Sequence, residues 1–150
     1  MTPTTADNGV SVVRAAELLA VHLADHDLPQ PVSLTVTTGW ERSKVSAQLR
    51  CATVPEVAGD LLAWAITLST IAVQAWSPPE GNRVHLSIAA TLADPAGSVE
   101  LDVFAGATDS PSLFADLNPG EHRAVSLDEL RGWAASTTAS PAPGTPETQR

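Results

Sequence analysis

The chain has 150 residues, of which 43% are apolar, and this is enough to bury one hydrophobic core of ordinary size. Its formal net charge is −9, and residues 94–129 carry eight acidic residues against one basic residue, Arg123. Such a field repels phosphate groups and attracts basic partners, so direct nucleic-acid binding is disfavoured. The single cysteine, Cys51, excludes an internal disulfide and a thiolate metal cluster.

Composition also divides the chain into a domain and two tails. Residues 1–9 are polar, and residues 136–150 are rich in Pro, Thr and Ser, so both segments are predicted to be disordered. Residues 10–135 are predicted to form a single domain. The N-terminus lacks a basic segment followed by an apolar one, so we expect a cytoplasmic protein. Residues 61–79 are uncharged but contain polar residues and two prolines, so no membrane span is expected.

The first predicted element is a helix over residues 10–25, which Pro29 and Pro31 separate from the next element. Apolar residues at helical spacing predict its buried side: Val12, Ala16, Leu19 and Leu23.

Two histidines near the end of this helix, His22 and His26, share one face and are weak candidates for metal ligands. The intervening acid is Asp25 rather than Glu, no strong third ligand follows, and histidines in a last turn also interact favourably with the helix dipole. We therefore predict no metal site and no other cofactor.

Residues 31–38 and 44–50 alternate between apolar and polar side chains and are separated by a turn that opens with Gly39. This predicts an antiparallel hairpin. Its tip carries Trp40 and Arg42, which could contact a single strand of nucleic acid, but too few basic residues accompany them for that interpretation to be preferred.

A helix is predicted from the capping-box spacing of Thr53 and Glu56 through to Ser69. It is apolar over most of its circumference, so we expect it to lie between the sheet and a second layer. Cys51, just before this helix, is predicted to be a small buried residue, although a helix start could also make its thiol reactive.

Three further strands are predicted over residues 71–76, 83–92 and 98–105. The turn between the last two, Asp94-Pro95-Ala96-Gly97, fits type I. The final strand places Glu100 and Asp102 outward, which suits an edge strand that must resist pairing with another chain.

Residues 106–125 are predicted to be a long irregular loop, and Ser126 and Glu129 have the spacing of a second capping box before a short last helix. The order α-ββ-α-βββ-α predicts an α+β fold with a five-stranded, mainly antiparallel sheet and helices packed on it.

Two surfaces follow from this reading. Small polar residues of the first four strands predict an interaction face, and the carboxylates of the last third predict an acidic patch. The interaction face consists of Ser33, Thr35, Ser46, Gln48, Ser87 and Thr91. The acidic patch consists of Glu100, Asp102, Asp109, Asp116 and Glu121.

The stretch from Trp76 to Ser87 has the form W-x-P-P-x-G-x-R-V-H-L-S, and an acidic segment and the ending Leu130 to Ala134 follow it. In these features the chain resembles a group of short acidic actinobacterial proteins. The resemblance implies no activity and no site residues, and it is compatible with a role on a plasmid, a phage or an integrated element.

Three functions remain open on the sequence. The preferred hypothesis is a non-enzymatic module that binds a protein partner or associates with itself. The second is an accessory or regulatory protein of a mobile element that acts on a basic nucleic-acid-binding partner. The third is an enzyme or small-ligand protein whose site lies near the 106–125 loop and includes His85, His122 or Asp116. The sequence contains no nucleophile elbow, phosphate loop or dinucleotide motif, which favours the first two.

Overall fold

The protein has an α+β fold, and in the residues that the structure describes three helices cover one face of a mixed seven-stranded sheet. The computed structural model describes residues 10–38, 43–79, 83–94, 97–108 and 114–139. The helices are α1 (Val12–Asp25), α2 (Val54–Ala65) and α3 (Leu127–Ala139). The strands are β1 (Ser33–Thr38), β2 (Ser43–Gln48), β3 (Ala52–Thr53), β4 (Ser69–Trp76), β5 (Val84–Asp94), β6 (Gly97–Thr108) and β7 (His122–Val125).

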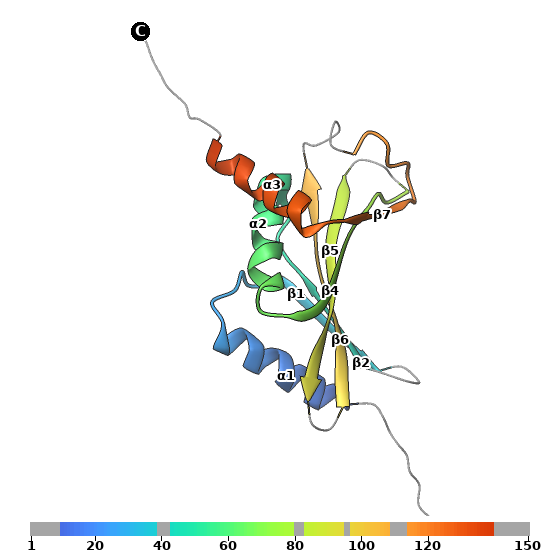
Figure 1. The fold of residues 1–150 in the computed structure, drawn as a ribbon. Helices are drawn as coiled ribbons and strands as arrows, with labels where there is room; N and C mark the ends of the chain where they lie inside the picture. Colours follow the sequence, from blue (N-terminus) through green and yellow to red (C-terminus); the bar gives the residue numbers. More distant parts are fainter. Residues whose placement is uncertain (1–9, 39–42, 80–82, 95–96, 109–113, 140–150) are drawn as a thin grey trace, which may run out of the picture.

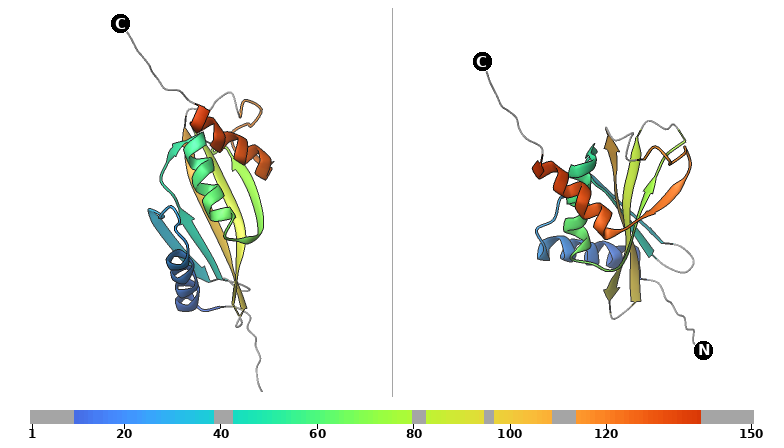
Figure 2. Two further views of the ribbon diagram at one scale, coloured as in Figure 1. Left: turned by 60° about the vertical axis from the view of Figure 1, so that its left-hand side comes forward. Right: turned by 45° about the horizontal axis from the view of Figure 1, so that its top comes forward.

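The strands lie in the order β1-β2-β6-β5-β4-β7, and the short β3 pairs with β6. All neighbours are antiparallel except β2 and β3, which run parallel to β6. Figures 1 and 2 show that α1, α2 and α3 all lie on the same side of the twisted sheet. The opposite side, called the uncovered face below, carries no helix in the described part of the chain.

The core lies between the helices and the inner face of the sheet. Alternation along β5 and β6 sends every second side chain into it, as the sequence predicts. The fully buried strand residues include Val45, Ala47, Leu86, Ile88, Val99, Leu101 and Val103. From the helices, Leu19, Leu61, Trp64 and Leu130 complete this core. α2 packs on β5 and β6 and also contacts α3, so it lies between two layers as expected.

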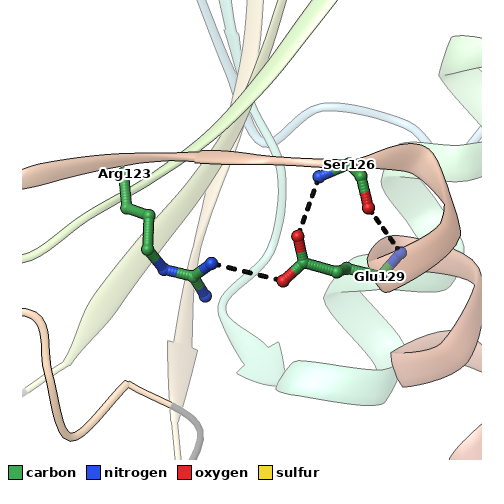
Figure 3. A network of polar contacts seen from close by, with 3 residues as sticks. All are labelled: Arg123, Ser126 and Glu129. Carbon is green, nitrogen blue, oxygen red and sulfur yellow. Dashed lines mark hydrogen bonds and ion pairs between the residues drawn. The ribbon is translucent and has the colours of Figure 1, made fainter.

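Both predicted capping boxes are present. In α2 the Thr53 hydroxyl accepts from the Glu56 backbone N–H and the Glu56 carboxylate accepts from that of Thr53. In α3 the Ser126 hydroxyl accepts from the Glu129 N–H at 3.0 Å, and the Glu129 carboxylate accepts from the Ser126 N–H at 3.1 Å. Figure 3 shows that Arg123 of β7 adds a third contact, donating to the same carboxylate at 3.2 Å.

The prediction of a five-stranded sheet is wrong in its strand count. β7 lies within residues 106–125, which are predicted to be a loop, and pairs with β4 from Val73 opposite Val125 to Trp76 opposite His122. Four residues are too few to show a clear alternation, so this strand is fixed by its neighbour rather than by its own sequence.

The prediction that β6 is a guarded edge strand is also wrong. β6 lies between β2 and β5, and the two edges of the sheet are β1 and β7. Alternation identifies a strand and its faces but does not say which hairpin docks against which. Glu100 therefore lies opposite Lys44 of β2, inside the sheet, rather than at its rim.

Two helix predictions need smaller corrections. α1 buries Ala15 and Leu19 but leaves Val12 and Ala16 exposed, because this helix is apolar on almost every side and its pattern does not define one buried face. α2 ends at Ala65 rather than at Ser69, and β4 begins at Ser69. Just after the end of α2, the Thr67 hydroxyl donates to the Trp64 carbonyl.

α3 extends past the expected domain boundary at residue 135, as far as Ala139. The hairpin tip with Trp40 and Arg42, the centre of the Asp94–Gly97 turn and Asp109 lie outside the described residues.

Candidate binding site

The predicted interaction face is open. The register places Ser33 opposite Gln48 and Thr35 opposite Ser46, and Ser87 and Thr91 lie on the same side of the sheet in β5. Directly paired residues share one face, so all six side chains lie on the uncovered face. Ser33, Thr35 and Gln48 are exposed, and the other three are half-buried.

Four aromatic rings gather on this same face, each from a different strand. Trp76 of β4 lies opposite both His85 of β5 and His122 of β7 in the strand register. The Trp76 ring centroid lies 5.3 Å from that of His85 and 5.7 Å from that of His122, and the His85 ring lies 6.2 Å from Phe104 of β6. We call these four residues the aromatic cluster.

The aromatic cluster lines a hollow of about 370 Å³, together with Gln74, Ser87 and Asp102. A second hollow of about 430 Å³ adjoins it, since Gln74 and Asp102 line both, and reaches Lys44 and Glu100. Each hollow has the size of a small-ligand site or of a pocket for one long side chain.

Asp102 is the carboxylate shared by the two hollows. Burial raises its pKa above the ordinary value of 3.8, and the positive charge of Lys44 offsets this only in part. None of the described residues donates a hydrogen bond to the Asp102 carboxylate. A half-buried carboxylate without a donor gains most from a cation brought by a ligand.

The sequence places His85 and Phe104 outward on their strands but does not predict the cluster. The sequence does contain a signal for it. The outward positions of β5 are otherwise small and those of β6 otherwise small or acidic, yet β5 carries the ring of His85 there and β6 the ring of Phe104. The contact between Trp76 and His122 could not be predicted from the sequence, because it depends on the pairing of β7 with β4.

The predicted acidic patch is divided between two places. Glu100 and Asp102 lie on the uncovered face, whereas Asp116 and Glu121 are exposed in the segment before β7. There the Glu121 carboxylate accepts from the Asn118 backbone N–H at 3.0 Å. Of the residues expected near a loop site, His85 and His122 line a hollow and Asp116 does not.

His22 and His26 have ring centroids 4.6 Å apart, but no group of three His, Cys, Asp or Glu residues suited to a metal ion occurs in the described part of the chain. The Nε2 atom of His22 lies 2.8 Å from the Thr67 hydroxyl, and its ring stacks on Trp64. Burial, followed by the charge of His26, lowers the His22 pKa below 6.5. This histidine thus joins α1 to the end of α2.

Cys51 is exposed, so the prediction of a buried cysteine is wrong. It follows β2 in a short connection that leaves the core, and its sulfur accepts from Nη1 of Arg83 at 3.2 Å. Gly106 makes room for this arginine, because a Cβ atom there would lie 2.9 Å from Arg83 Cδ.

Comparisons of the chain with protein-family models, with curated proteins and with solved structures gave no match. None of the helices in the described ranges is both long enough and apolar enough to cross a membrane.

Proposed function

We propose that this protein is a non-enzymatic binding module that holds a positively charged segment of a partner protein on its uncovered face. The observation that carries the proposal is the aromatic cluster open to solvent beside Asp102, a half-buried carboxylate to which no described residue donates a hydrogen bond.

The chemistry of the two hollows favours a cation. Indole and phenyl faces attract guanidinium and ammonium groups, and a carboxylate accepts two parallel hydrogen bonds from arginine. Trp76, Phe104 and Asp102 supply these three surfaces within one hollow. An arginine side chain therefore satisfies both the carboxylate and the rings.

The surroundings of the hollows favour a peptide over an isolated small molecule. Ser46, Gln48 and Thr35 continue the uncovered face away from the hollows with hydroxyl and amide groups that can bond to an extended backbone. The net charge of −9 attracts a basic chain from a distance. A basic nucleic-acid-binding protein, the partner in the mobile-element hypothesis, has the same chemistry.

The test compares two variants that remove the same charge. Asp102→Asn removes the carboxylate of the site, and Asp116→Asn removes an exposed carboxylate that lines neither hollow. The probe is a short peptide of alternating Arg and Ser, titrated by calorimetry. We expect Asp102→Asn to weaken binding about tenfold or more, as for loss of a hydrogen bond to a charged group. Asp116→Asn should weaken it less than about twofold.

Equal affinities of the two variants would show that only overall charge attracts the peptide, and the site would be refuted. Trp76→Leu should weaken binding as well, because the cation loses its aromatic face. Free arginine that binds as tightly as the peptide would instead identify a small-ligand site.

A further inference from the structure

Two of the four rings in the aromatic cluster are imidazoles, and they lie on the two sides of Trp76. In the strand register Trp76 lies opposite His85 of β5 and His122 of β7, and its ring centroid is 5.3 Å and 5.7 Å from theirs. His122 is exposed and His85 is half-buried. The imidazole group changes its charge between about pH 5 and pH 8. Within this range the cluster therefore gains up to two positive charges.

The charges that face His85 come from β6 and from the residues just before β5. Of the described residues that line the hollow of the aromatic cluster, Asp102 is the only one with a carboxylate. Arg83 lies against Gly106, which is opposite His85 in the register, and it donates to the sulfur of Cys51. The β4 strand contributes only the uncharged side chains of Gln74 and Trp76 to this hollow.

The charged residues beside His122 have partners within the chain. Glu121 accepts from the Asn118 backbone N–H, and Arg123 donates to Glu129. The charged residues that line only the adjoining hollow, opposite each other in the register, are Lys44 and Glu100. Asp102 is thus the charge that an imidazolium and the arginine of a partner both face in the hollow.

A protonated imidazole competes with the partner's arginine for the same groups. Both histidine rings lie within the distance of about 6 Å over which an indole face attracts a cation. Each imidazolium also brings a positive charge into the hollow that Asp102 lines, and this charge repels a second cation. A neutral imidazole does not repel the arginine, and its unprotonated nitrogen accepts a hydrogen bond from a guanidinium.

We propose that acidification releases the partner's cationic segment, because the protonated His85 and His122 take the place of its arginine beside Trp76 and Asp102. This regulation rests on the proposed function of the site. Binding and protonation are reciprocal, so an arginine that is weakened by protons must itself expel protons when it binds.

The first experiment repeats the calorimetric titration with the Arg-Ser peptide at about pH 8 and about pH 5.5, on either side of the imidazole range. We expect the wild type to lose at least about tenfold in affinity at the lower pH, as for like charges brought within about 6 Å of the ligand. Protonation of Asp102 also weakens the binding of a cation, so the contribution of the histidines has to be separated by substitution.

The double variant His85→Phe, His122→Phe keeps two rings in the cluster but removes both ionisable groups. Whatever its affinity at pH 8, that affinity should change less than about threefold between the two pH values. His26→Phe is the matched control, because His26 follows α1 on the opposite side of the sheet and lines neither hollow. It should show the same loss of affinity as the wild type.

The second experiment measures the expelled protons in the wild-type protein and so does not depend on the double variant. At about pH 6.5 the binding enthalpy should vary with the ionisation enthalpy of the buffer, as it does when protons are released. His122→Phe alone, at an exposed position, should reduce the number of protons released.

The outcomes separate this inference from the proposed function. A wild type that fails to bind the peptide at pH 8 would refute the site, and the regulation with it. Binding at pH 8 that is equally tight at the lower pH would overturn only the regulation. The same holds for a double variant that loses as much affinity as the wild type, or for binding without proton release.

Discussion

Two carboxylates show how local surroundings set the charge state of a single residue. The Ser126 backbone N–H, followed by the Arg123 side chain, donates to Glu129 and holds the pKa of that carboxyl below its ordinary value (Figure 3). Asp102 lies half-buried with no hydrogen-bond donor among the described residues, and burial raises its pKa. Glu129 thus contributes to stability, whereas the charge of Asp102 opposes folding and is available for binding.

Asp102→Asn is therefore expected to stabilise the free protein at pH 7, by less than about 1 kcal/mol because the carboxylate keeps part of its hydration. The pKa of Asp102 is higher in the folded state than the ordinary 3.8. Well below pH 3.8 the carboxyl is protonated in both states and does not affect the free energy of unfolding. As the pH rises from 3.8 through the folded pKa, the ionisation of Asp102 lowers that free energy. Urea unfolding at pH 7 and pH 3 measures the difference in the free energy of unfolding between wild type and Asp102→Asn, and this difference should vanish at pH 3.

The exposed Asp116→Asn is the control and should change the unfolding free energy by no more than about 0.5 kcal/mol. A loss of stability in Asp102→Asn at pH 7 would mean that Asp102 has a stabilising partner within the chain.

At the scale of helices and strands, short sequence patterns correctly predict the features that depend on residues close together in the chain. Both capping boxes are confirmed, because the residues that satisfy the first N–H groups of α2 and α3 stand three apart in the sequence. The inward residues of β5 and β6 are also predicted, since alternation depends on one strand at a time. The buried side of α1 is not predicted correctly, because valines and alanines occur on almost every side of this helix and do not define one buried face.

Ser126→Ala should reduce the free energy of unfolding by about 1 kcal/mol, since the Glu129 N–H loses its acceptor. Ser136→Ala, later in the same helix, should cost less than about 0.5 kcal/mol. Denaturant titrations of both variants provide the measurement. Equal effects would show that the start of α3 is not held by its cap.

Glu129→Gln adds a dependence on pH. The pKa of Glu129 is lowered in the folded protein. The contribution of its carboxylate to the free energy of unfolding is therefore present above the unfolded pKa and is lost as the pH falls through the folded pKa. The difference in the free energy of unfolding between wild type and Glu129→Gln should therefore shrink as the pH falls through the folded pKa.

At the scale of the whole molecule, the arrangement depends on contacts that no local pattern contains. The sequence predicts the α+β class and a face of small polar residues. It does not predict that β2 joins β6, that β7 completes the sheet, or that Trp76 and His122 meet. Each of these needs two segments far apart in the chain, and the candidate site lies where two such pairings, β2 with β6 and β4 with β7, are joined by the strands between them.

The overall charge gives a prediction at the same scale. The association rate constant of the Arg-Ser peptide, measured by stopped-flow fluorescence, should fall at least about tenfold between about 0.01 M and 1 M salt. The dissociation rate should change less, because it reports contacts within the hollows. A peptide with citrulline in place of arginine should bind slowly at every salt concentration. An association rate that is independent of salt would exclude attraction by the acidic surface.

The parallel pairing of β2 with β6 has a consequence for the growth of the chain on the ribosome. Residues 43–48 need residues 99–104 as their neighbours, so the first hairpin and α1 leave the ribosome well before the strand that holds them in place. During that interval the edge of β2 that later pairs with β6 is exposed. The first half of the protein must wait for the second, and its two halves can only become stable together.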